Sequence, residues 1–218
     1  MSNNKNSNNN NKNTITRAYN FELRAENNDT HGDHITGRPI VYNSRTDLGW
    51  FDEIIEAGAL DKANLKDVRF LVNHDTSMIP LARSRNNNKN STMQMEVVKE
   101  GMDIRVNLDT ENNSEAKNLY SAIKRGDISG MSFMFTIDDE EWENLESDHP
   151  TRHIRKIGTV LEVSAVTFPA YEATEISARA KEALDSAKEL LDSKRRDSLD
   201  SDEKLLELEK AKIDNLFF

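Results

Sequence analysis

The chain has 218 residues and a formal net charge of −10, because 39 acidic residues outnumber 29 lysines and arginines. An acidic balance of this size disfavours binding to a phosphate backbone, so we expect no nucleic-acid partner. The chain contains no cysteine, which excludes disulfide bonds, cysteine nucleophiles and thiolate metal ligands. No apolar run is long enough to span a bilayer, so we expect no membrane association.

The polar residues concentrate at the two ends of the chain. Residues 1–14 form an asparagine-rich leader, which is expected to be disordered because it cannot bury apolar surface. Residues 15–173 carry most of the apolar runs and are expected to form the globular domain. Residues 174–218 are expected to form a helical, charged tail. The sequence therefore predicts one domain with two polar tails.

The first part of the domain contains several short, β-prone runs. Residues 50–59 differ from them, because Phe51, Ile54 and Ile55 have the spacing of a short amphipathic helix that Gly58 would end. Residues 83–90 are expected to form a polar loop. Strands are expected over residues 14–25, 35–42, 68–72 and 79–82, followed by a hairpin of 93–98 and 102–108 that turns at 99–101.

The second part begins with a helix over residues 114–125. Ser114 is its expected N-cap, and Gly126 is expected to end it. A strand over 128–137 follows, then an acidic loop over 138–146, and the last strands over 154–167, which Pro169 would end.

Leucines recur at about seven-residue spacing in the tail, which is typical of a coiled coil or a docking helix. A single amphipathic helix that packs on its own domain is the alternative interpretation. The residues are Leu184, Leu191, Leu199, Leu206 and Ile213, with a charged break at residues 194–196.

Three separated segments each place a reactive side chain beside an apolar, β-prone run. These are His74 in residues 70–75, Ser132 in residues 128–135, and Glu162 in residues 161–170. A histidine, a serine and a carboxylate, each carried by a strand end, are the components of nucleophilic acyl transfer. The three segments therefore indicate a serine protease.

The three residues would have different roles in that reaction. Ser132 would attack the scissile carbonyl, and His74 would take its proton, because an imidazole can exchange protons near neutral pH. Glu162 would accept a hydrogen bond from the other ring nitrogen and fix the tautomer. Ser129 is an alternative nucleophile and Asp75 an alternative orienting acid. Ser164, two residues after Glu162, is expected to support the site by hydrogen bonding.

Two groups of histidines have neighbours of metal-ligand type. His31 and His34 lie near Asp29 and Asp33, and a second pair follows at residues 149 and 153. Neither group shows a third and fourth ligand on a predictable surface, and the chain has no glycine-rich phosphate loop. We therefore expect no metal and no cofactor.

The same segments carry a family resemblance over about residues 17–175. Gly58-Ala-Leu60, Asn73-His-Asp75, residues 126–133 and residues 161–170 follow one another as in the prohead (capsid maturation) proteases of tailed bacteriophages. The chain resembles the HK97-type group of these enzymes, and the resemblance implies the same roles for His74, Ser132 and Glu162. One position departs from the family pattern, since Met134 stands where the family usually has the glycine of Ser-x-Gly-Phe.

The resemblance also implies a fold and a biological role. The fold would be α+β, with a mostly antiparallel, barrel-like sheet and flanking helices, as in herpesvirus assemblin. The enzyme would act in the host cytoplasm inside the procapsid. There it would cut the scaffold or the scaffolding segment of the major capsid protein, and also itself. A homo-oligomer is expected. The alternative is an inactive capsid-assembly or scaffolding protein with the same fold.

Overall fold

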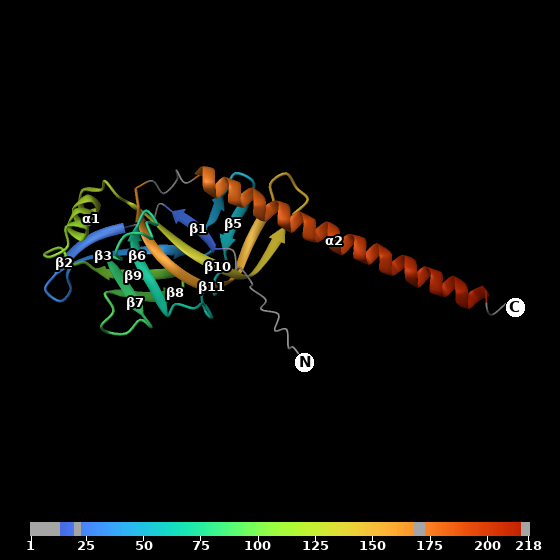
Figure 1. The fold of residues 1–218 in the computed structure, drawn as a ribbon, viewed down its shortest axis with the longest axis horizontal. Coiled ribbons are helices and arrows are strands. Elements are labelled where there is room, and N and C mark those ends of the chain that lie inside the picture. Colours follow the sequence, from blue (N-terminus) through green and yellow to red (C-terminus); the bar gives the residue numbers. More distant parts are fainter. Residues whose placement is uncertain (1–13, 20–22, 168–172, 215–218) are drawn as a thin grey trace, which may run out of the picture.

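The computed structural model describes residues 14–19, 23–167 and 173–214. These residues form a strand-rich α+β structure with two sheets and two helices (Figure 1). Residues 1–13 of the expected leader, and Pro169, lie outside the described residues. The elements are β1 (Thr14–Tyr19), β2 (Leu23–Asn28), β3 (Gly32–Val41), β4 (Arg45–Asp47), β5 (Asp52–Ile55), β6 (Asp67–Val72), β7 (Ala82–Arg85), β8 (Met93–Val98), β9 (Gly101–Asn107), α1 (Ser114–Arg125), β10 (Gly130–Glu143), β11 (Thr151–Val166) and α2 (Ala173–Asp214).

The strands form one sheet of seven and one of four. The larger sheet has the order β1-β10-β11-β5-β4, with β6 also paired to β11 and β7 paired to β6, and the smaller has the order β2-β3-β9-β8. Most pairings are antiparallel, while β11 runs parallel to β5 and β6. Neither sheet of described strands closes on itself. The expectation of a mostly antiparallel α+β fold is confirmed, whereas its barrel-like form is not.

The long strands β10 and β11 form the centre of the larger sheet. Their antiparallel register runs from Gly130 opposite Val166 to Glu143 opposite Thr151, with several irregularities. The rings of Phe133 and Phe135 stack at 4.7 Å in β10 and are fully buried. The buried aromatic and branched side chains of both strands make this hairpin a large part of the core.

The expected helix over residues 50–59 is wrong, because residues 52–55 form β5, which pairs with β11. Phe51, Glu53 and Ile55 all point inward and are at most 1% exposed. Glu53 is buried because the side chain of Arg17 binds it, with Nη2 donating to Oε2 at 2.7 Å. In a strand, every second side chain points inward, and the inward positions are usually apolar. Because Glu53 occupies one of these positions, the hydrophobicity of this segment does not show the alternation of a strand.

The expected loop over residues 138–146 is also wrong for its first six residues, since β10 continues to Glu143. The acidic side chains of this strand pair with basic side chains of β11. Lys156 Nζ donates to Asp139 Oδ2 at 2.7 Å, and Arg152 and Arg155 bind Glu140 and Glu141. Cross-strand pairs of opposite charge favour extension of the hairpin.

Two strands in the first half differ from their predicted bounds. The predicted strand over residues 14–25 is divided into β1 and β2, which belong to different sheets. The predicted strand over 79–82 is displaced to β7, which occupies the first part of the expected loop. Ala82 and Ser84 of β7 are buried, with arginines between and after them. Because the inward position 84 is a serine and not an apolar residue, the hydrophobicity pattern did not indicate this short strand.

Helix α1 forms where it was predicted. Its N-cap is Asn113 rather than Ser114, because the Asn113 side chain accepts hydrogen bonds from the backbone amides of Glu115 and Ala116. Gly126 ends the helix in a left-handed conformation with φ of 81°, which glycine adopts at low cost. The predicted 93–98/102–108 hairpin is present as β8 and β9, with Val98 opposite Gly101.

Helix α2 begins beside the larger sheet, and its C-terminal part projects away from the domain (Figure 1). Ala180 and Leu184 pack with Leu48 and Phe51. This region therefore packs on its own domain, while Leu199 is 68% exposed. The side chains of Leu206 and Ile213 lie outside the described part. Among the described residues, neither helix combines the length and apolar content that a membrane span requires.

Candidate active site

The three predicted site residues come from three neighbouring strands. Ser132 lies near the start of β10, Glu162 lies in β11, and His74 follows the end of β6. β11 is hydrogen-bonded to β10 on one side and to β6 on the other. This order places β11 between the segments that carry the serine and the histidine, so the carboxylate is held between them.

The ring of His74 is hydrogen-bonded at both nitrogens. Its Nε2 lies 2.5 Å from Ser132 Oγ, and its Nδ1 is hydrogen-bonded to Glu162 Oε1. A carboxylate can only accept, so Nδ1 carries a proton and donates it to Glu162. In the neutral ring, Nε2 then has a lone pair that can accept a hydrogen bond from the serine hydroxyl. This tautomer is the one that a general base requires.

The site is almost closed to solvent. Ser132 is fully buried, Glu162 is 3% exposed, and the side chain of His74 is 11% exposed. Hydrogen bonds and charge interactions are stronger in such an environment than in water. The arrangement can therefore stabilise a transient imidazolium beside the carboxylate.

The backbone at His74 has an unusual conformation. Asn73 and His74 have φ of 51° and 57°, which side-chain-bearing residues rarely adopt. Contacts with β11 hold the turn: Asn73 N donates to Ala165 O at 2.9 Å, and Thr167 N donates to Asn73 Oδ1 at 2.9 Å. The turn directs the imidazole back over the sheet instead of along the strand.

Ser164 contacts two parts of the same site. Its hydroxyl donates to Glu162 Oε2 at 2.6 Å and accepts from the backbone amide of His74 at 3.1 Å. The side chain is fully buried. The expected hydrogen bond to the site residues is therefore present.

Arg17 contacts Ser132, and the sequence analysis did not predict this contact. Ser132 Oγ lies 2.8 Å from the carbonyl oxygen of Arg17 in β1, within hydrogen-bond distance. The guanidinium of Arg17 is buried and binds Glu53 through two hydrogen bonds. Because the contact to the serine is made by a backbone atom, no residue type could have indicated it.

The alternative residues lie elsewhere or have other partners. Ser129 precedes β10 and is exposed, so it is Ser132 that meets the imidazole. Asp75 is exposed and accepts hydrogen bonds from the side chain and the backbone amide of Ser77, which lower the pKa of its carboxyl group. Met134 follows in β10 as the partner of Glu162, and its φ is not positive, so its backbone does not require glycine.

The remaining histidines bind neighbouring groups. His34 Nδ1 lies 2.9 Å from the carbonyl oxygen of Gly32, and His153 lies between Glu56 and Glu143. His149 and His153, the second group that the sequence analysis considered, each have their own carboxylate partners, Asp52 and Glu56.

His149 is the histidine that comes nearest to a metal-ligand set. Its ligand atom lies within 4.8 Å of those of Asp47 and Asp52. Arg45 already binds Asp52, with Nη1 2.8 Å from Oδ2. The arrangement is that of a surface ion-pair group.

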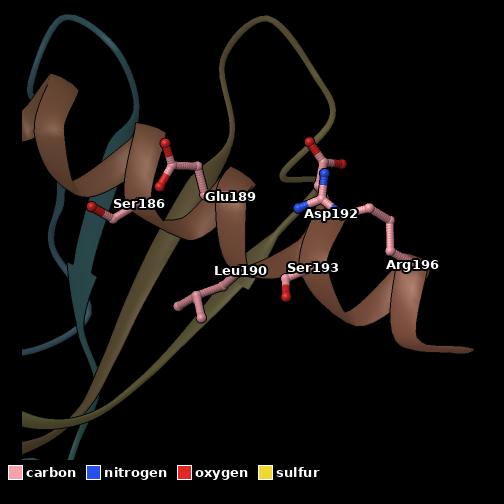
Figure 2. A pocket seen from close by; sticks show the side chains of 6 residues that line it. All are labelled: Ser186, Glu189, Leu190, Asp192, Ser193 and Arg196. Atoms are coloured by element: carbon pink, nitrogen blue, oxygen red, sulfur yellow. The ribbon is translucent and has the colours of Figure 1, made fainter.

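An open hollow of about 610 Å³ lies along α2 (Figure 2). Its lining is polar and charged apart from one leucine, and α2 contributes none of the three predicted site residues. The hollow is therefore a feature of the helix surface. The lining residues are Ser186, Glu189, Leu190, Asp192, Ser193 and Arg196.

The chain is similar to known phage proteins. Residues 19–189 match the family described as caudovirus prohead serine protease. No protein with a curated description matches the chain. Among solved structures, that of the bacteriophage T4 capsid assembly protease matches with a TM-score of 0.42 and 12% identity, over 70% of this chain and 96% of that one.

Proposed function

Because this chain belongs to the caudovirus prohead serine protease family, we propose that it cleaves peptide bonds through Ser132, His74 and Glu162. The observation that carries the proposal is the imidazole of His74, which is hydrogen-bonded at one nitrogen to Ser132 and at the other to Glu162. A serine, a base and an orienting carboxylate are defined as a triad by this geometry and not by their order in the chain.

In the proposed reaction, His74 Nε2 takes the proton of Ser132 as Oγ attacks the scissile carbonyl carbon. Glu162 stabilises the resulting imidazolium through the hydrogen bond at Nδ1. The imidazolium then gives the proton to the leaving amine, which departs and leaves an acyl ester on Ser132. Water, activated by the same imidazole, hydrolyses the ester and restores the serine. These steps require no metal or cofactor.

The proposed substrates are the scaffold or the scaffolding segment of the major capsid protein, and the chain itself. Cleavage of the chain itself would fall in its polar ends, since chain termini are common sites of proteolysis. The enzyme would act in the host cytoplasm, inside the procapsid, and its own fold would be of the assemblin type. A homo-oligomer is part of this proposal, because the resemblance to the family implies it.

Co-expression with the phage's major capsid protein, followed by mass spectrometry, tests the proposal. The wild type is expected to yield defined truncations of the capsid protein, whereas Ser132→Ala yields intact masses. Ser129→Ala is the matched control, since it removes an exposed serine three residues away and should process normally. Processing by Ser132→Ala would contradict the assignment of the nucleophile. Intact masses in the wild type as well would favour an inactive scaffolding protein.

A further inference from the structure

Ser164 is the direct cross-strand partner of Ser132, but its hydroxyl has different contacts. In the register of β10 and β11 the two serines lie opposite each other. Ser132 meets the ring of His74, while Ser164 meets the carboxylate of Glu162 and the backbone amide of His74. A hydroxyl has one proton and can accept as well. Because the carboxylate and the amide have fixed roles, Ser164 must donate to Glu162 and accept from His74.

These bonds close a ring through three residues. The backbone N–H of His74 donates to Ser164, Ser164 donates to Glu162 Oε2, and Nδ1 of His74 donates to Glu162 Oε1. His74 is therefore held at two points, its backbone and its ring, by two side chains of one strand. Both oxygens of the Glu162 carboxylate are occupied by donors.

This closed set of hydrogen bonds holds the backbone of His74 in an unfavourable conformation. His74 has a φ of 57°, and left-handed conformations are unfavourable for residues with a side chain. The hydrogen bond from His74 N to Ser164 opposes relaxation of this φ. If the backbone relaxed, the imidazole would turn away from Ser132, and the distance of 2.5 Å between Nε2 and Oγ would increase.

We propose that Ser164 is a positioning residue for catalysis, which holds the backbone of His74 and the carboxylate of Glu162 in register with the nucleophile. This role rests on the proposed function of the site. Ser164 does not touch the reacting atoms, so its removal should weaken the chemical step without changing substrate binding. A shift of about 1 Å in a catalytic group can reduce a rate by about 10²-fold.

The test compares Ser164→Ala with wild type on a peptide that spans the mapped cleavage site. We expect kcat to fall by about 10- to 100-fold with KM nearly unchanged, and Ser164→Thr, which keeps the hydroxyl, to recover most of the loss. Ser84→Ala is the matched control, because Ser84 is also fully buried and, within the described residues, its hydroxyl has no hydrogen-bond partner. The control should retain the wild-type kcat.

A second measurement does not depend on activity. The proton between His74 Nδ1 and Glu162 should give a strongly downfield proton resonance, identified by its absence in His74→Ala. We expect this resonance in wild type and Ser84→Ala, and its loss or broadening in Ser164→Ala. If Ser164→Ala does not fold, Ser164→Cys replaces it, since a thiol of similar shape is a weaker hydrogen-bonding group.

Wild-type kcat and an unchanged resonance in folded Ser164→Ala would overturn the positioning role. Equal losses in Ser84→Ala would also overturn it, since they would reflect only the removal of a buried serine. A wild type that cleaves no peptide but shows the resonance would contradict the proposed function, and the effect of Ser164→Ala on the resonance would still decide whether Ser164 positions His74.

Discussion

The hydroxyl of Ser132 lies 2.8 Å from the carbonyl oxygen of Arg17, and this contact joins the proposed nucleophile to the edge strand β1. The same hydroxyl lies 2.5 Å from His74 Nε2. A serine has one proton, so it can donate to only one of these acceptors at a time. When the hydroxyl donates its hydrogen bond to the carbonyl oxygen of Arg17, it does not donate to Nε2 of His74, and the imidazole lacks the hydrogen bond through which it would take the serine proton. Ser132 is also fully buried, so a substrate cannot reach its hydroxyl in this arrangement.

The first prediction concerns movement of β1. Thr16 and Met134 are cross-strand partners in β1 and β10, and both are half-buried. Opposite Cβ atoms lie about 4.5–5.5 Å apart, close to the reach of a disulfide. We expect the oxidised double variant Thr16→Cys/Met134→Cys to react with a fluorophosphonate probe at least ten times more slowly than its reduced form. A substrate must reach Ser132, and β1 is the strand that contacts its hydroxyl.

The reduced form of the same variant is the control for any effect of the substitutions themselves. Because the chain has no cysteine, no other disulfide can form within it. Equal labelling before and after reduction would show that access to Ser132 opens without displacement of β1.

The second prediction concerns the carboxylate. In Glu162→Gln, the side-chain amide can present its nitrogen instead of an acceptor to His74 Nδ1, which disfavours the active tautomer. We expect kcat to fall by roughly 10²- to 10⁴-fold, with residual hydrolysis because serine and base remain. Steady-state kinetics on the mapped peptide, with Asp75→Asn as the control, measure the effect. A wild-type rate in Glu162→Gln would remove this residue from the mechanism.

The third prediction concerns the buried ion pair beneath the site. Glu53 is 1% exposed and binds Arg17, and Arg152 Nη1 lies 3.5 Å from Glu53 Oε2. Glu53→Gln would leave two buried guanidinium groups without their shared carboxylate. Breaking a buried pair in this way costs about 3–5 kcal/mol. Urea unfolding should show a loss of this size in the free energy of unfolding.

Asp103→Asn is the control for the ion pair, because Asp103 is 41% exposed and its partner Arg38 is 34% exposed. Exposed pairs contribute about 0–1 kcal/mol. A loss for Glu53→Gln no larger than that of the control would mean that the buried pair does not stabilise the fold.

The proximity of the three site residues could be predicted, because each reactive side chain lies beside an apolar run in the sequence. His74 and Ser132 each lie at the end or start of a strand that hydrophobicity identifies, and Glu162 lies within one. Strand β5 was not predictable, since Glu53 occupies an inward position where the pattern requires an apolar residue. Its charge is balanced by Arg17, a residue 36 positions away, and only the fold brings them together.

The limits of strand β10 were hidden for a related reason. Its last residues are acidic and resemble a loop, but their partners in β11 are basic, such as Lys156 opposite Asp139. Charge pairing across a hairpin depends on the sequences of both strands. It is therefore not detected when each segment is examined separately. Arg17 contributes a carbonyl to the site, and a backbone atom leaves no signature in the sequence.

The fourth prediction concerns acid stability. Thr110 Oγ1 and Asn27 Nδ2 donate to the carboxyl of Asp33 at 2.5 and 2.6 Å, and these hydrogen bonds lower its pKa. An aspartate with a folded pKa below the unfolded value of about 3.9 stabilises the fold above that value, and loses this contribution as the pH falls through its folded pKa. Asp33→Asn should therefore show a smaller loss of stability on acidification than wild type.

Chemical unfolding between pH 6 and about 2.5, the range around the unfolded aspartate value, provides the measurement. Thr110→Val removes the hydrogen bond that contributes most to the lowered pKa of Asp33, and it should give a pH dependence between those of wild type and Asp33→Asn. Identical slopes for all three proteins would show that this carboxyl does not contribute to acid unfolding.

The fifth prediction concerns how α2 is attached to the domain. Leu184 is 5% exposed and packs with Leu48 and Phe51, whereas Leu190, six residues later on the same helix, is 64% exposed. Truncation of a buried leucine to alanine typically costs about 2–5 kcal/mol, and truncation of an exposed one costs little. Because Leu184 contributes to a small cluster apart from the main core, its loss should release α2 locally instead of unfolding the domain.

Hydrogen exchange should therefore accelerate in α2 around residues 180–190 in Leu184→Ala, with β10 and β11 unchanged, and Leu190→Ala should match wild type. Equal protection of α2 in both variants would mean that the helix is held by other contacts, such as the ion pair of Arg195 with Glu146 at 2.6 Å.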